Sequence, residues 1–316
     1  MSSEATGMKA TAFASGHPLV SLVIPAFNGR EMIGRTIESV LAQTWPAVEV
    51  IVVDDGSTDG TAEAVARFGD RVRYYRQENS GTAAARNLGL RHAKGEYFAV
   101  LDQDDLWVPH KLERQMPRFL EDPKIGVVYA GIEFFHMHSG EVTANYYPSD
   151  EPDVHDVLGH MTLALQTMVF RRSALDKIGP FDVSLGGTDD WDISIRIAAE
   201  FRIVGIDEIL GRVGLHQKQQ GRNAPRMFFN AMRVLEKHAD LHPGCALCRK
   251  AIRQSTAILR EHYYGHFKGR AFDAWRSGRY ASAAIEAVRG FWQYPPAIKR
   301  VLGRTLFGIE TPHAQH

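Results

Sequence analysis

Cysteine is scarce in this sequence, which contains only Cys245 and Cys248 among its 316 residues. A single Cys-x-x-Cys pair is not a disulfide framework. His238 and His242 lie just upstream, so a small metal site is the alternative, but two histidines in that position match none of the usual zinc spacings. The pair therefore predicts two free thiols on adjacent turns of a helix, in the reducing environment of a cytoplasm.

An excess of charge of one sign is also lacking, because Lys and Arg total 37 and Asp and Glu total 37. This balance excludes a global field that would favour nucleic acid or an anionic membrane as the partner. No apolar run approaches the roughly 20 residues that span a bilayer. Residues 1–18 have neither the basic start nor the apolar stretch of a signal peptide, so we expect a disordered leader there.

What the sequence does contain, from Leu19 onward, is an alternation of short apolar runs with amphipathic stretches of helical period. This pattern predicts a parallel sheet covered by helices. The apolar runs have almost no polar positions, as expected for strands that are buried on both faces. The four expected strand and helix units are 19–24 with 31–43, 48–53 with 61–68, 72–75 with 82–92, and 97–101 with a helix from about residue 109.

The pattern becomes mixed after residue 124. Residues 126–135 and 141–147 predict a hairpin, 167–170 a further strand and 189–200 a helix. Beyond residue 222 the sequence favours helices with aromatic and basic side chains. We therefore expect three parts: the leader 1–18, an α/β domain 19–222 with halves 19–124 and 125–222, and a helical region 223–316.

Polar segments follow each of the four expected strands. They are Pro-Ala-Phe-Asn at 25–28, Asp-Asp-Gly-Ser-Thr-Asp at 54–59, Asn-Ser-Gly at 79–81 and Asp-Gln-Asp-Asp at 102–105. In open α/β sheets, ligands bind outside the carboxyl ends of the strands. Packing requires no carboxylates at that edge, so the four segments together predict a ligand site.

Asp102 and Asp104 are the candidate metal ligands. They are two residues apart at the end of an expected strand, and a period of two places both side chains on one face. Mg²⁺ or Mn²⁺ is usually held by one or two carboxylates, with substrate phosphates and water completing the shell. The alternative is an acidic loop that caps the next helix, and Asp105 fits a capping or supporting role better than a direct one.

The segments 20–28, 52–59, 79–87 and 101–105, in this order and spacing, resemble the family 2 glycosyltransferases of GT-A fold over about residues 19–216. The resemblance implies a mostly parallel sheet flanked by helices, to which this chain adds a C-terminal helical appendage. It also implies a nucleoside-diphosphate sugar donor, a divalent metal and inversion at the anomeric carbon. Residues 19–124 would form the nucleotide-binding half and 125–222 the acceptor half.

The resemblance also assigns roles to individual residues of the donor site. Phe27 would stack on the base where the family often has Tyr, unless it is a core aromatic. Arg86 would contact base or phosphate, unless it is a surface charge of its helix. Asp55 would accept a hydrogen bond from a base N–H, and Asp102 and Asp104 would hold ribose and metal. The full set of expected nucleotide contacts is Pro25, Ala26, Phe27, Asn28, Asp55, Arg86, Asp102 and Gln103.

The segment 187–196 resembles the family's acidic pair before an aromatic, in which the second acid is the catalytic base; this acid is Asp190 here. The first acid is usually Glu, whereas this chain has Asp189, whose arm is shorter. Both also suit the first turn of a helix as negative charges. Asp192 fits a structural role, and His216 stands where relatives often carry a histidine that approaches the metal.

The expected partners are a nucleoside-diphosphate sugar, preferably linked to UDP on family grounds, and a saccharide or lipid-linked saccharide acceptor. The Gln-x-x-Arg-Trp pattern of processive synthases is missing, which favours transfer of one or a few sugars in cell-surface polysaccharide or glycolipid synthesis. Residues 289–304 interleave aromatic and basic side chains. This pattern favours packing against the catalytic domain, and peripheral contact with the inner face of a membrane is the alternative that we carry as a prediction. A catalytically silent nucleotide-sugar-binding assembly protein is the alternative.

Overall fold

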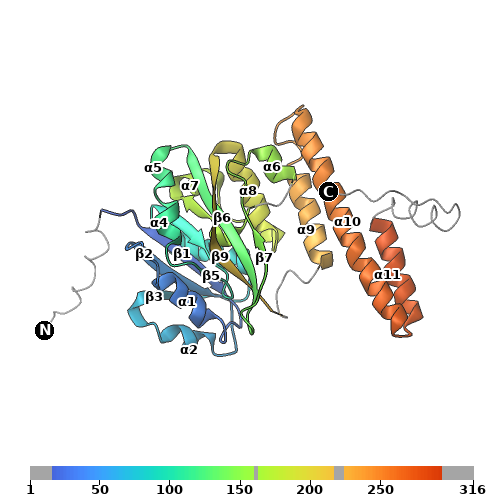
Figure 1. Ribbon diagram of the computed structural model, residues 1–316, viewed down its shortest axis with the longest axis horizontal. Coiled ribbons are helices and arrows are strands. Elements are labelled where there is room, and N and C mark those ends of the chain that lie inside the picture. The colour runs from blue at the N-terminus through green and yellow to red at the C-terminus, as the bar shows by residue number, and fades with distance from the viewer. Residues whose placement is uncertain (1–15, 160–162, 217–223, 294–316) are drawn as a thin grey trace. The chain divides into compact units, whose positions relative to one another are not determined.

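The computed structural model describes residues 16–159, 163–216 and 224–293 (Figure 1). The chain forms two compact units, Met1–Gln220 and Gly221–His316. The expected leader lies almost wholly outside the described residues. Each unit is a fold of its own kind: the first is α/β and the second is built of helices.

Four parallel strands form the first half of the sheet, in the order β3-β2-β1-β4. Val20 of β1 pairs with Val48 of β2 on one side and with Tyr97 of β4 on the other. Every residue of β1 is buried, which explains its continuous apolar run. The strands are β1 (Val20–Ala26), β2 (Val48–Asp54), β3 (Val72–Arg76) and β4 (Tyr97–Val100). The predicted parallel arrangement of these four strands is confirmed.

The helices after the first three strands also match the prediction. They are α1 (Ile33–Leu41), α2 (Thr61–Ala66) and α3 (Thr82–His92). The buried residues of α1 recur at positions 33, 36, 37 and 40, one face of a helix. The expected helix from about residue 109 is instead two short helices, α4 (Lys111–Gln115) and α5 (Arg118–Glu121). Pro117 stands at their junction, where its missing N–H interrupts helical hydrogen bonding.

The second half of the sheet is antiparallel at its junction with the first. The short strand β8 (Val169–Arg171) lies between β4 and β6 (Ile125–His136) and runs antiparallel to both. β6 and β7 (Val142–Tyr146) form the predicted hairpin. Two strands were not predicted: β9 (Arg202–Leu215), which runs parallel to β6, and the two-residue β5 (Leu106–Trp107) at the far edge.

The helices of the second half pack beside this part of the sheet. The helix α8 (Asp189–Glu200) has the predicted bounds, while α6 (Val154–Gly159) and α7 (Arg172–Ile178) were not predicted. Three short 3₁₀ segments, Gly69–Arg71, Leu165–Thr167 and Val183–Leu185, join the larger elements. The α8 helix begins directly after Thr188, so the acidic residues 189 and 190 open its first turn.

The second unit contains α9 (Ala224–Lys237), α10 (Ala246–Arg276) and α11 (Tyr280–Gln293). Tyr263 of α10 stacks on Phe228 of α9, with ring centroids 4.4 Å apart. Cys245 caps α10 and Cys248 lies in its first turn, so only one of the two thiols is within the helix and they do not lie on adjacent turns as predicted. Among the helices that the structure describes, none is long and apolar enough to cross a membrane.

Candidate functional site

Asp55, the first residue after β2, organises the loop that precedes α3. Its carboxylate accepts hydrogen bonds from Gln77 Nε2 at 2.7 Å and from the backbone N–H groups of Ser80 and Gly81, both at 2.8 Å. Gly81 has φ of +89°, a left-handed conformation that a side chain would strain. Asp55 is buried and fixes the shape of this loop. This structural role is additional to the contact with a base that the resemblance implies.

Phe27 lies at the same edge, directly after β1. The residue is 41% exposed, so the alternative of a core aromatic is wrong. The Gln103 side chain holds the Phe27 backbone at two points, accepting from its N–H and donating to its carbonyl oxygen, each at 3.0 Å. Asn28, with φ of +49°, accepts from the Thr58 N–H at 2.9 Å. The chain thus presents an exposed aromatic on a fixed backbone, while Pro25 and Ala26 are buried as the last residues of β1.

Asp104 and His216 meet at the carboxyl end of the sheet although 112 residues separate them. Asp104 Oδ2 lies 2.6 Å from His216 Nε2. Burial and the neighbouring Asp102 charge raise the pKa of Asp104, against the opposing effect of His216. Asp105 points inward, where its carboxylate accepts from the Gly214 N–H at 3.0 Å, and burial raises its pKa well above the usual range. Its inward position agrees with a supporting role.

The carboxylates and the imidazole at this edge are donor types that suit a divalent cation. Asp102 and Asp104 follow one strand, β4, and His216 follows β9. Carboxylate oxygens are preferred ligands of Mg²⁺ and Mn²⁺, and imidazole is a common ligand of transition metals. Burial and, after it, the neighbouring Asp102 charge raise the pKa of Asp104, and a bound cation would favour its ionised form. The residues present therefore fit a divalent metal.

Arg86 bridges the two halves of the domain. One guanidinium nitrogen lies 3.0 Å from Asp102 Oδ1, and the other lies 2.6 Å from Asp189 Oδ2. Its side chain is buried, so the alternative of a helix-surface charge is wrong. Burial alone would lower the pKa of Arg86, but the carboxylates of Asp189 and Asp102 outweigh it and raise the value.

Asp190 occupies the second position of α8 and is half-buried. Its Oδ1 accepts a hydrogen bond from the backbone N–H of Trp191 at 2.8 Å. Burial and the adjacent Asp189 charge raise the pKa of Asp190 to about 7, while Arg86 acts in the opposite direction. A carboxyl group with this pKa can both take up and release a proton near neutral pH.

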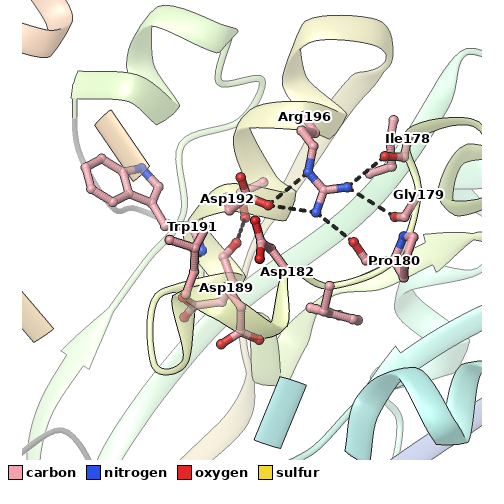
Figure 2. A network of polar contacts seen from close by, with 12 residues as sticks. Ile178, Gly179, Pro180, Asp182, Asp189, Trp191, Asp192 and Arg196 are labelled. Carbon is pink, nitrogen blue, oxygen red and sulfur yellow. Dashed lines mark hydrogen bonds and ion pairs between the residues drawn. The ribbon is translucent and has the colours of Figure 1, made fainter. Parts of the chain in front are cut away.

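Other residues of the first turn of α8 are anchored by contacts of their own. Figure 2 shows Arg196 between Asp192 and the end of α7. Arg196 pairs with Asp192 at 2.8 Å and donates to the carbonyl oxygens of residues 178, 179 and 180 at 2.8, 3.1 and 3.0 Å. Trp191 Nε1 donates to the Val157 carbonyl oxygen at 2.7 Å. Asp192 is fully buried in this network, which agrees with a structural role.

Similar sequences support one family. Residues 21–179 match Glycosyl transferase family 2. An uncharacterized glycosyltransferase of Rickettsia typhi is 34% identical over 254 residues, which cover 77% of this chain and 76% of the relative. WfgD of Escherichia coli, named as a UDP-Glc:alpha-D-GlcNAc-diphosphoundecaprenol beta-1,3-glucosyltransferase, is 30% identical over 60% of this chain and 73% of its own length.

The fold also has a solved counterpart. The mannosyltransferase PcManGT of Pyrobaculum calidifontis, solved in complex with GDP-Man and Mn²⁺, aligns with a TM-score of 0.60 and 20% identity, covering 94% of this chain and 82% of its own. At this identity the likeness concerns the fold, which is the expected GT-A arrangement of a mostly parallel sheet flanked by helices. Together with the sequence matches, this fold shows that the chain belongs to glycosyl transferase family 2.

Proposed function

We propose that the protein is an inverting glycosyltransferase that moves a sugar from a nucleoside-diphosphate donor to an acceptor hydroxyl, with Asp190 as the general base. The observation that carries this proposal is the half-buried Asp190 carboxyl with a pKa of about 7, which stands beside the Arg86 and Asp102 charges at the carboxyl end of the sheet. A base with a pKa near the working pH is well matched to proton removal.

The donor would bind along the edge formed by residues 25–28, 55, 86 and 102–104. The exposed Phe27 ring offers a stacking face for the base, since its backbone is fixed by Gln103. Asp55 retains lone pairs beside its three donors and can accept from a base N–H. The name of WfgD specifies UDP-Glc, and PcManGT was solved in complex with GDP-Man. We favour a UDP-linked hexose because WfgD is the more similar of the two.

Asp102, Asp104 and His216 would hold Mn²⁺ or Mg²⁺. When bound, the ion supplies positive charge against the donor diphosphate. His216 Nε2 lies 2.6 Å from Asp104 Oδ2, so these two donor atoms stand side by side where one ion would bind. Arg86 holds one oxygen of Asp102, which fixes the direction of that carboxylate.

Asp190 would act on the other reactant. Its ionised carboxylate takes the proton of the acceptor hydroxyl while that oxygen forms a bond to the anomeric carbon. The bond from the anomeric carbon to the diphosphate oxygen breaks on the opposite face, so the configuration inverts. The products are the glycoside and a nucleoside diphosphate, and the proton resides on Asp190 until solvent removes it.

The acceptor would be a saccharide or a lipid-linked saccharide in cell-surface polysaccharide or glycolipid synthesis. This proposal is supported by WfgD, whose name specifies a diphosphoundecaprenol-linked acceptor. Such a substrate fits a cytoplasmic protein that contacts the inner face of a membrane through its C-terminal residues. Most of the basic and aromatic segment 289–304 lies outside the described residues.

The test is transfer from labelled nucleotide sugars, with donor binding measured in parallel. Asp190→Asn keeps the size and hydrogen bonding of the side chain but removes its basicity. Donor binding should persist while turnover falls roughly 10²- to 10⁴-fold. Near-parental turnover in this variant would show that Asp190 is not the base. Absence of transfer and donor hydrolysis in the parent, with donor binding retained, would instead favour a catalytically silent binding protein.

A further inference from the structure

The first turn of α8 is held from several directions around Asp190. Asp189 is bound by Arg86, Trp191 by the Val157 carbonyl oxygen and Asp192 by Arg196. Asp190 stands among these anchored residues, and the hydrogen bond to its carboxylate comes from its own helix, from the Trp191 N–H. The anchors therefore determine where the Asp190 carboxylate lies.

Arg86 differs from the other anchors because it comes from the donor half of the domain. It belongs to α3, whereas Asp189 is 103 residues further along the chain. The same guanidinium binds Asp102 at the end of β4, so a single side chain joins the strand that carries the expected metal ligands to the helix that carries Asp190. The Arg86 Nε is buried without a hydrogen-bond partner. Among the described residues, the guanidinium therefore contacts the site through its two ion pairs, with Asp102 and Asp189.

Both carboxylate oxygens of Asp189 are bound by protein groups. It is 1% exposed, and its oxygens accept from Arg86 at 2.6 Å and from the Gly187 N–H at 3.2 Å. Separating a buried carboxylate from its partner leaves an uncompensated charge, which strongly destabilises the fold. The Arg86–Asp189 pair is therefore held in one geometry. At this position the family usually has Glu; the shorter Asp189 is used here to bind protein, which leaves it poorly placed to contact an acceptor.

We propose that Arg86 and Asp189 are positioning residues for the reaction: their ion pair fixes the first turn of α8 against the donor half and sets both the place and the charge state of Asp190. This inference rests on the proposed function, because it takes Asp190 as the base. The charged groups that face Asp190 are Asp189 on its own helix, Arg86 from α3 and Asp102 from the end of β4.

The charges predict opposite effects for two substitutions. Arg86 lowers the pKa of Asp190 and Asp189 raises it. Arg86→Gln should therefore move the acidic limb of the kcat profile to higher pH, and Asp189→Asn should move it to lower pH. A residue that only supports the fold would shift neither limb. Both variants should also lose kcat, by up to about 10²-fold, because small displacements of a catalytic group are costly.

Arg86→Lys separates charge from geometry. The lysine retains the positive charge but cannot reach two carboxylates with a planar fork. We expect its acidic limb to stay near that of the parent while kcat falls. Arg73→Gln is the matched control. Arg73 pairs with Glu49 at 2.9 Å near the N-terminal ends of β2 and β3, whereas the site lies at the carboxyl ends of the strands. This variant should keep the parental limb and kcat.

The two proposals fail in different ways. If Asp190→Asn retains turnover, the proposed base is wrong and the positioning role falls with it. If Asp190→Asn is inactive but the limbs of Arg86→Gln and Asp189→Asn coincide with that of the parent, the base stands and the positioning role is overturned. If Arg86→Gln does not fold, Asp189→Asn and Arg86→Lys still decide the question through the direction of the limb and the loss of kcat.

Discussion

Asp190 links the structure to a measurable pH dependence. Burial and Asp189 raise its pKa to about 7, and only the ionised carboxylate can accept a proton. We expect kcat to rise with pH through a limb centred near 7 and to level off above it, because the fraction of ionised Asp190 then approaches one. Rates with saturating donor and acceptor between pH 5 and 9 test this. A flat profile through this range would contradict the assignment.

The same carboxyl affects stability. Its folded pKa of about 7 lies above the ordinary value of 3.8, so the folded state binds the proton more tightly than the unfolded state. Its favourable contribution is complete below pH of roughly 4 and is lost as pH rises through about 7. Asp190→Asn removes the ionisation, so its Tm should exceed that of the parent increasingly between pH 5 and 8. Equal Tm differences at both ends would show that Asp190 ionises normally.

Gly214 allows β9 to approach the expected metal ligands. A Cβ on this residue would collide with the Asp104 carbonyl oxygen and lie 2.9 Å from Met137 Cγ. Gly214→Ala should therefore displace the 102–105 segment, cost about 1–3 kcal/mol in the free energy of unfolding, and weaken Mn²⁺-dependent nucleotide binding. Denaturant unfolding and titration calorimetry measure both effects. Gly34→Ala is the control: Gly34 lies in α1 with no neighbour within 4 Å, so neither quantity should fall.

At the scale of elements, the first four strands were predictable because parallel strands buried on both faces have uninterrupted apolar runs. The α3 and α8 helices had the bounds read from their sequence pattern. β9 was missed because its run is broken by Gly205, Gly211 and Gly214 and by two acids at 207 and 208. Those glycines lie where neighbouring segments come too close for a side chain, a constraint that only the folded chain reveals.

The candidate site was predictable in composition but not in its connections. The polar segments after the strands indicated where the site lies, and the family resemblance assigned Phe27, Asp55, Asp102 and Asp190 to it. The structure brings several of these residues to one edge. The pairing of Arg86 with Asp189 spans 103 residues, and no local pattern signals a contact over that separation. The hold of Gln103 on the Phe27 backbone was missed for the same reason, since it joins two different loops.

For the whole molecule, ligand binding should be visible as stabilisation. A ligand at 100 times its dissociation constant raises the free energy of unfolding by about 2.7 kcal/mol. We expect UDP to raise Tm when Mn²⁺ is present and to have a smaller effect without it. Asp104→Ala should abolish the Mn²⁺-dependent part, because Asp104 is an expected ligand. Asp176→Ala, which removes an exposed carboxylate of α7, should respond like the parent; if Asp104→Ala does too, the metal assignment is wrong.

Contact with a membrane is tested by comparing the full chain with a chain that lacks the C-terminal segment. Truncation after Gln293 keeps α11 and removes a segment that contains Lys299, Arg300 and Arg304. We expect the full chain to sediment weakly with anionic vesicles and the truncated chain to sediment less, because basic side chains are attracted to anionic lipid headgroups. Raised salt should weaken this binding, and neutral vesicles serve as the reference. Equal sedimentation of both chains would remove the proposed role of the tail.

The position of β8 between β4 and β6 has a consequence for how the protein is made. A ribosome completes β4 at residue 100, but the strand that covers its free edge begins at residue 169. At about 5–20 residues per second, the nascent chain spends several seconds with an apolar strand edge unpaired. During that interval the emerging domain is open to association with other nascent chains, and a chaperone that shields strand edges would act on it before the second half arrives.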